Sequence, residues 1–319
     1  MYPYLPAIGP FHLPFHLLNL TIGPWQPGTF GLLLWLAAVV ATIVLYKNYE
    51  RKGVDADALN VVALVVVAGV IGAKAWHELQ DVRELRYALH IIGAPGWHRP
   101  MQVAVGFLGW FRDGFAWFGG MLAGIAALLW LGHGTRFKGP GWKSIVDPGP
   151  VPGAHLGAMR MLDLAAPAAA ISYGVGRIGC LLAGDGDYGI NTTLPWGVHM
   201  AKNALVPPIP ATALVQPTPI YELLFALAVF WVLWQLGKKT GSGSSRPVGW
   251  LTGLYLVLSG IGRFLVEFVR INPKLYFHGT FSNAQMAAAA STLVGLAVLG
   301  VAQARHVEWV PKLRAEARS

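Results

Sequence analysis

Charged side chains inside otherwise apolar segments are the first candidates for chemistry in this sequence. Six of them lie in stretches with almost no other charge: Lys74, Asp163, Arg177, Glu222, Arg263 and Glu267. A charge in hydrocarbon costs about 2.5–3.5 kcal/mol on insertion scales, so each one needs a partner or a function. Arginine forks match the oxygens of a phosphate, so two arginines facing the interior of a helix bundle indicate an anionic ligand.

Two of these observations have a simpler explanation that stays open at this point. Arg263 and Glu267 are four residues apart on one expected helix and could merely neutralise each other. The glycines of the segment 174–189 could serve helix packing alone. That segment also holds Arg177, and Asp185 and Asp187 follow in its glycine-rich turn, which favours a functional site. No strand is expected before it, so it is not a nucleotide-binding loop.

The elements that position these residues are expected to be membrane-spanning helices. Hydrophobic residues make up 55% of the 319 residues and charged ones 12%, about half the usual share in soluble proteins, and the mean hydropathy is +0.50. The sequence predicts an all-α polytopic membrane protein with one transmembrane domain over 1–303, a cap segment at 77–114 and a charged tail at 304–319. Seven spans are expected, at 28–46, 59–76, 115–131, 161–183, 219–236, 250–269 and 284–302.

Composition also excludes several classes of function. The net charge of +9 comes mostly from residues between the spans, where it suits anionic lipid head groups better than nucleic acid. The single cysteine, Cys180, rules out an internal disulfide or a thiolate metal cluster. The ten histidines show no metal-binding pattern with a third ligand. We therefore expect no metal and no organic cofactor.

Five segments, in order along the chain, carry a resemblance to one family. They are Gly72–Lys74, Arg112–Gly120, Gly176–Asp185, Gln216–Glu222 and Gly262–Arg270. The third resembles a Gly-Arg-x-Gly-Asn-Phe-x-Asn-Gly-Glu signature, and the last a Gly-Arg-Phe-x-x-Glu-Phe-x-Arg pattern. Together the five resemble the bacterial prolipoprotein diacylglyceryl transferases over almost the whole chain.

The resemblance implies an enzyme of the bacterial inner membrane. It would move the diacylglyceryl group of phosphatidylglycerol to the lipobox cysteine thiol of a prolipoprotein and release glycerol phosphate. The alternatives are a divergent homologue with impaired catalysis, and a membrane transporter of anions or lipids. Seven unequal spans without an internal repeat speak against the transporter.

The resemblance also assigns roles to individual residues. It predicts catalytic roles for four of them: Arg177, Arg263, Asp185 and Glu267. It predicts contacts with phosphatidylglycerol for the two arginines and six further residues: Lys74, Gly119, Gly120, Cys180, Tyr221 and Glu222.

The chain departs from the family pattern at positions that matter for proton transfer. Phe118 stands where many members have a histidine or tyrosine before two glycines, and Gln216 replaces a histidine. Cys180 and Asp185 replace an asparagine and a glutamate. Phenylalanine cannot accept a proton, so the sequence assigns no general base.

Orientation in the membrane follows from the distribution of lysine and arginine. With the N-terminus outside, fourteen basic residues fall on the inner side and seven on the outer side. The positive-inside rule then places the C-terminus in the cytoplasm. A tag at the C-terminus should resist external protease in intact cells and be digested only after lysis. Digestion in intact cells would contradict this orientation.

Overall fold

The computed structural model describes nine stretches of the chain: residues 11–12, 21–22, 28–94, 98–112, 116–137, 155–184, 188–199, 214–238 and 246–307. The chain forms two compact units. Unit 1 comprises Met1–Gly53, Gly141–Val151 and Asp163–Ser319. Unit 2 comprises Val54–Pro140 and Pro152–Leu162. The predicted charged tail lies largely outside the described residues.

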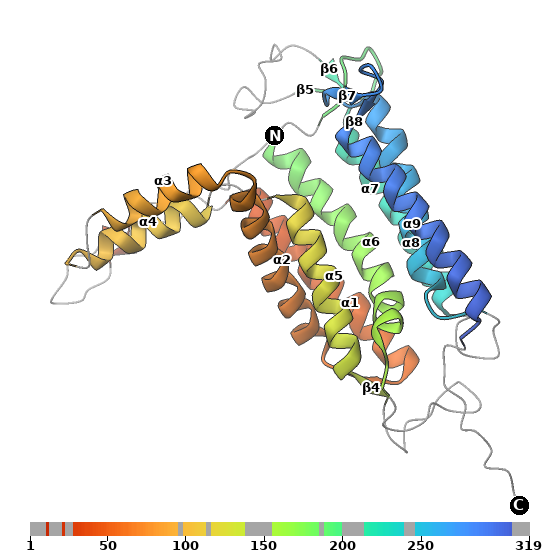
Figure 1. Ribbon diagram of the computed structural model, residues 1–319. Coiled ribbons are helices and arrows are strands. Elements are labelled where there is room, and N and C mark those ends of the chain that lie inside the picture. The colour runs from red at the N-terminus through yellow and green to blue at the C-terminus, as the bar shows by residue number, and fades with distance from the viewer. Residues whose placement is uncertain are drawn as a thin grey trace, which may run out of the picture. The chain divides into compact units, whose positions relative to one another are not determined.

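Seven helices in the described part of the chain are long and apolar enough to cross a membrane, as predicted (Figure 1). They are α1 (Thr29–Lys52), α2 (Ala58–Gln80), α5 (Trp117–Gly134), α6 (Ala158–Ala183), α7 (Thr218–Lys238), α8 (Trp250–Val266) with the 3-10 turn η1 (Glu267–Val269), and α9 (Asn283–Arg305). The predicted all-α membrane architecture is confirmed. Most helices run a few residues beyond the predicted spans, because a helix continues after its apolar stretch ends.

Short strands connect some of the helices. Each of the four described sheets is an antiparallel pair of two strands. The pairs are β1 (Phe11–His12) with β2 (Thr21–Ile22), β3 (Val54–Asp55) with β4 (Arg136–Phe137), β5 (Val198–His199) with β6 (Leu214–Val215), and β7 (Lys274–Tyr276) with β8 (Phe281–Ser282). In the first three pairs the registers are Phe11 to Ile22, Val54 to Phe137 and Val198 to Val215.

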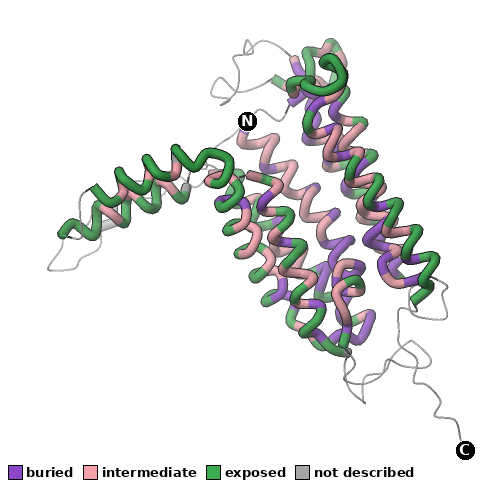
Figure 2. The backbone as a smooth tube through the Cα atoms, viewed as in Figure 1, coloured by how far each residue is buried: buried purple, intermediate pink, exposed green. Residues whose placement is uncertain are grey.

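The helices expose many large apolar side chains. Trp35, Trp130 and Trp231 are 64%, 71% and 62% exposed, and exposed residues run along the length of α9 (Figure 2). Such surface is unfavourable in water and favourable against lipid tails. The exposure pattern therefore agrees with helices that face a bilayer.

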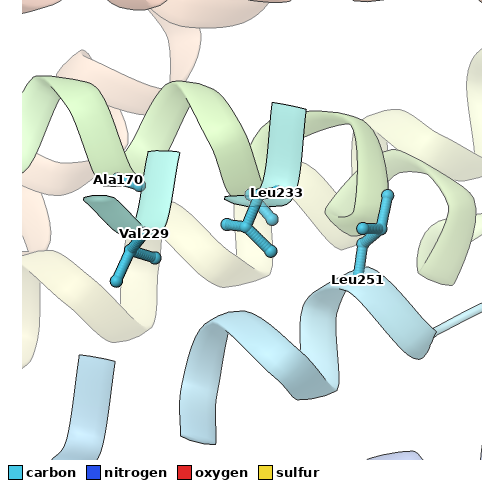
Figure 3. Close-up of a cluster of buried hydrophobic side chains, with 5 residues drawn as sticks. Ala170, Val229, Leu233 and Leu251 are labelled. Atoms are coloured by element: carbon cyan, nitrogen blue, oxygen red, sulfur yellow. The ribbon is translucent and has the colours of Figure 1, made fainter. Parts of the chain in front are cut away.

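The apolar core of unit 1 lies between α6, α7 and α8 (Figure 3). Ala170 of α6, Val229 and Leu233 of α7, and Leu251 of α8 are all at most 4% exposed. Trp250, Tyr255 and other partly buried residues pack around them. This cluster holds together the three helices that carry the candidate catalytic residues of unit 1.

Asp163 of α6 fixes the start of α8 through hydrogen bonds from Gly249 and Thr252. Its Oδ2 accepts a hydrogen bond from the backbone N–H of Gly249 at 2.7 Å. Its Oδ1 accepts from the backbone N–H and the hydroxyl of Thr252, at 2.9 and 2.7 Å. These donors lie at a helix N-terminus, where N–H groups lack partners within the helix and a carboxylate is favoured.

In unit 2, α2 and α5 pack closely because both carry glycines at their contact. A Cβ on Gly119 would overlap the carbonyl oxygen of Gly72, and one on Gly72 would overlap Ala123. A Cβ on Gly120 would lie 3.1 Å from the carbonyl oxygen of Gly69. Small residues let helix backbones approach, which is how helices associate where lipid replaces water.

The predicted cap segment contains two further helices, α3 (Val82–Gly93) and α4 (Pro100–Arg112), which lie side by side (Figure 1). The first residues of the predicted segment, from His77 to Gln80, still belong to α2. Lys74 of α2 connects that helix to α4. Its Nζ lies 2.8 Å from Glu78 Oε1 and donates to the carbonyl oxygen of Trp110 at 2.7 Å.

The α2–α5 contact generates a prediction about stability. Gly119→Ala should destabilise the protein by about 1–3 kcal/mol, because the new methyl group has no room against Gly72. Gly124→Ala on the same helix is the matched control, since its Cβ would meet only Val65 at 3.6 Å, an ordinary contact. Thermal unfolding in detergent measures both. Equal midpoints for the two variants would show that the contact is looser than described.

Candidate active site

Three helices of unit 1 bring charged residues together, and glycines permit their approach. α6 supplies Arg177, α7 supplies Glu222 and α8 supplies Arg263. A Cβ on Gly174 would lie 3.2 Å from Ala226 of α7, and a Cβ on Gly262 would overlap the ring of Phe225 of α7. Glycines beside the two arginines therefore let α7 lie close to both neighbouring helices.

Glu222 is the centre of the cluster, and its side chain is only 4% exposed. Its Oε1 accepts hydrogen bonds from Tyr173 Oη at 2.7 Å, Arg177 Nη2 at 3.2 Å and Arg263 Nη1 at 3.1 Å. Its Oε2 lies 3.1 Å from Arg177 Nε and 3.4 Å from Arg270 Nη1. Both carboxylate oxygens are thus engaged, and four side chains converge on one buried acid.

A second carboxylate, Glu267, is placed where α8 passes into η1 and is 1% exposed. Its Oε2 lies 2.9 Å from Arg263 Nη2 and 3.6 Å from Arg270 Nε. Its Oε1 accepts hydrogen bonds from Asn272 Nδ2 at 2.6 Å and Ser282 Oγ at 2.8 Å. Ser282 is also the N-cap of α9, so the start of that helix is tied to the cluster.

Arg263 links the two carboxylates and is the most accessible arginine of the cluster. Its side chain is 24% exposed, against 14% for Arg177 and 5% for Arg270. Arg263 does pair with Glu267, as expected if the two residues merely neutralise each other. It also binds Glu222 on another helix, so neutralisation within α8 does not account for its position.

Around Arg177, two side chains of α6 complete the arrangement. Its Nη1 donates to Cys180 Sγ at 3.4 Å, and its Cζ lies 5.0 Å from the centre of the Tyr173 ring. Both neighbours are reached at the three- and four-residue spacings that bring side chains together on one helix face. Cys180 is therefore a neighbour of the arginine and is partly buried.

Loops adjoin the cluster through backbone hydrogen bonds. The N–H of Gly189 donates to the carbonyl oxygen of Gln216 at 2.8 Å, and that of Ile190 donates to Val269 at 2.8 Å. A Cβ on Gly189 would lie 2.5 Å from the Val269 oxygen, so the close approach requires glycine.

Burial raises the pKa of the neighbouring Tyr188 phenol, which disfavours its ionised form.

Tyr221 and Gln216 form a polar chain beside the cluster. Tyr221 Oη donates to Gln216 Oε1 at 3.1 Å and accepts a hydrogen bond from Trp196 Nε1 at 2.7 Å. Gln216, which the resemblance sets in the place of a histidine, thus accepts a hydrogen bond here. An amide side chain does not act as a base near neutral pH.

The structure brings together five of the predicted site residues, all in unit 1: Arg177, Cys180, Glu222, Arg263 and Glu267. Tyr221, also in unit 1, precedes Glu222 on α7 and contacts Gln216 and Trp196. Three others, Lys74, Gly119 and Gly120, lie in unit 2 with the packing contacts given above. Asp185, like Asp187, lies outside the described residues. Within the described part of the chain, histidine, cysteine, aspartate and glutamate side chains form no group of three that could hold a metal ion.

Two side chains that contact Glu222 were absent from the predicted site, Arg270 and Tyr173. Arg270 closes the segment Gly262–Arg270 and lies one residue beyond the predicted span 250–269. Its place three residues after Glu267 was a signal that it could share that helical face. Tyr173 stands four residues before Arg177, but an aromatic residue in an apolar span is too common to single out.

The fold and the cluster define a class: a multi-pass helical membrane protein with arginines and glutamates paired inside its bundle. Comparison with known sequences then identifies the family. The pattern of the family described as prolipoprotein diacylglyceryl transferase matches residues 18–301. This chain belongs to that family.

Individual relatives agree with the family match. The chain is 28% identical to the phosphatidylglycerol–prolipoprotein diacylglyceryl transferase of Clostridium tetani, over 77% of this chain and 81% of the relative. It is 28% identical to the protein of that name from Leifsonia xyli subsp. xyli, over 96% and 83%. It is 27% identical to the second such protein of Clostridium perfringens, over 77% and 80%.

Proposed function

We propose that this chain transfers the diacylglyceryl group of phosphatidylglycerol to the lipobox cysteine thiol of prolipoproteins, in the inner membrane of a bacterium. This is the first step of lipoprotein maturation. Family membership supports the reaction class, and the names of the relatives support the lipid and protein substrates. The observation that carries the proposal for this chain is the buried cluster centred on Glu222.

The charge of the cluster suits the proposed lipid. Three guanidinium groups and two carboxylates leave one net positive charge on these five side chains. The phosphodiester of phosphatidylglycerol carries one negative charge. Arg263, the most accessible of the arginines, and Arg177 would hold the phosphate oxygens, since the guanidinium fork matches their geometry.

The reaction then requires only positioning, charge stabilisation and an activated thiol. The cysteine sulfur, after losing its proton, attacks the carbon of the diacylglyceryl group that is bonded to a phosphate oxygen. The new carbon–sulfur bond forms as the carbon–oxygen bond breaks, and the electron pair leaves on glycerol phosphate. Arg177 and Arg263 stabilise the negative charge that grows on the departing phosphate. Glu267 keeps Arg263 oriented through its ion pair with Nη2.

The remaining assignments follow the family resemblance. Asp185 would orient an arginine, hold the glycerol hydroxyls or accept the thiol proton. Cys180, Tyr221 and Glu222 would line the lipid site beside Arg177. The resemblance also assigns lipid binding to Lys74, Gly119 and Gly120. The base that takes the thiol proton is left unassigned, because Phe118 cannot accept one and Gln216 already binds Tyr221.

One assay separates this function from its alternatives. Purified protein is supplied with phosphatidylglycerol vesicles and a lipobox peptide, and the lipidated peptide and glycerol phosphate are quantified. Consumption of lipid only when the peptide is present supports the transferase. Lipid or anion movement without covalent transfer would favour a transporter, and a silent protein would indicate an impaired homologue.

The phosphate-holding role predicts the effect of exchanging arginine for lysine. Arg177→Lys and Arg263→Lys should each lower transfer by at least about a hundredfold, because a single ammonium cannot make the paired contacts of a guanidinium. Arg246→Lys is the matched control, since Arg246 lies outside the cluster and contacts Leu236 and Trp250. Near-normal turnover by both cluster variants would remove this role.

The departures from the family pattern generate a second prediction. Phe118→His should change the rate by less than about tenfold, roughly 1.4 kcal/mol of barrier, if this chain activates the thiol without a side chain at position 118. Asp185→Asn should cost more than about a hundredfold, as expected for a charge-stabilising or proton-transferring group. Peptide transfer by both variants in one nanodisc preparation measures this. A silent wild type that Phe118→His activates would refute the proposed function.

A further inference from the structure

Tyr173 is a polar member of the cluster to which the mechanism above gives no role. One side chain makes two contacts: the phenol donates to Glu222 Oε1 at 2.7 Å, and the ring lies beside the guanidinium of Arg177 at 5.0 Å. Those two partners are themselves joined, at 3.1 and 3.2 Å. Tyrosine, carboxylate and arginine therefore form a closed triangle between α6 and α7.

The carboxylate needs such a contact because its own torsion does not fix it. Rotation of a glutamate carboxylate about its last bond is broad and roughly two-fold. Glu222 is surrounded by three arginines, so rotated orientations would still find positive partners. The Tyr173 hydroxyl donates to one carboxylate oxygen from a fixed place on α6, and so favours one plane of the carboxylate over others.

Tyrosine is suited to this task by its charge and its stiffness. The phenol is a neutral donor, so it orients the acid without changing the net charge that the lipid phosphate meets. Its ring has only two side-chain torsions, and its four-residue spacing from Arg177 on α6 places it against that arginine. A lysine or arginine at this position would add a charge to the site.

We propose that Tyr173 is a positioning residue for phosphatidylglycerol turnover. By holding the Glu222 carboxylate in one orientation, it holds Arg177 and Arg263 in the arrangement that binds the phosphodiester. Tyr173 acts through Glu222 and touches neither the lipid nor the thiol. This inference rests on the proposed function for its effect on rate, whereas the contact between Tyr173 and Glu222 can be tested without turnover.

The first test is Tyr173→Phe, which keeps the ring beside Arg177 and removes only the hydroxyl. We expect kcat for peptide lipidation to fall about tenfold while KM for phosphatidylglycerol changes less than about twofold, as expected for an interaction that matters more in the transition state. Tyr255→Phe is the matched control. Tyr255 is a partly buried tyrosine of α8 that packs on the apolar core, so its variant should turn over normally.

The second test asks whether Tyr173 acts through the carboxylate. In a double-mutant cycle, Tyr173→Phe should cost little further activity in a Glu222→Gln background, because the group it orients is already lost. Independently of turnover, the infrared difference spectrum between wild type and Tyr173→Phe should show a shifted carboxylate stretch. That band should disappear when the same difference is taken in Glu222→Gln protein.

The outcomes separate this inference from the proposed function. Unchanged kcat in Tyr173→Phe, an equal loss in Tyr255→Phe, or full additivity with Glu222→Gln would each overturn the positioning role. If wild type itself forms no lipidated peptide, the proposed function fails. The infrared measurement then still decides whether Tyr173 orients Glu222, and an unchanged carboxylate band overturns that contact.

Discussion

The carboxylate of Glu222, buried among three arginines, is the interaction on which the arrangement of unit 1 depends. Removing one partner from a buried ion pair costs about 3–5 kcal/mol, because the remaining charge is left without compensation. α6, α7 and α8 must therefore face one another with these residues inward, since a turn of any helix about its axis would strand a charge. The backbone N–H of Ile190 donates to the carbonyl oxygen of Val269, which lies between Glu267 and Arg270. This hydrogen bond fixes the loop at Ile190 to the segment that carries these two charged residues.

Lipid surroundings make this constraint stronger than it would be in a soluble protein. Lipid tails are as apolar as leucine, so burial of apolar surface does little to choose which helix faces meet. Close packing and polar contacts make that choice instead. In unit 1 the two kinds of contact coincide, because Gly174 and Gly262 each lie within three residues of an arginine that binds Glu222.

The spans could be predicted from the sequence, whereas the pairing of charges across them could not. Hydropathy and length identify a helix. They identified α6 as a span although it contains a proline, Pro167, and a charged residue, Asp163. Hydropathy gives no rotational phase between helices, so the partner of Arg177, forty-five residues away in Glu222, was not foreseeable. The pairing of Arg263 with Glu267 was foreseeable, because the two residues are four positions apart in one predicted span.

The same limit applies to the glycines of the family-like segments. Gly119 and Gly120 were predicted to contact lipid, yet their contacts with Gly72 and Gly69 give them a packing task of their own in unit 2. Gly189 has another task, since it lets a loop approach Val269. A shared motif thus mixes residues that hold helices together with residues that meet the substrate, and only the contacts of each position separate them.

The charge balance of the cluster also bears on how the proposed reaction ends. Before transfer, one net positive charge on five side chains meets one negative charge on the phosphodiester. Cleavage turns the diester into a monoester, whose second pKa of about 6 gives it close to two negative charges at neutral pH. The net positive charge of the cluster attracts a dianion more strongly than a monoanion, which is the stabilisation that the proposed reaction requires of Arg177 and Arg263. The departure of glycerol phosphate must then be driven by its hydration in water, since keeping a charge out of water is costly.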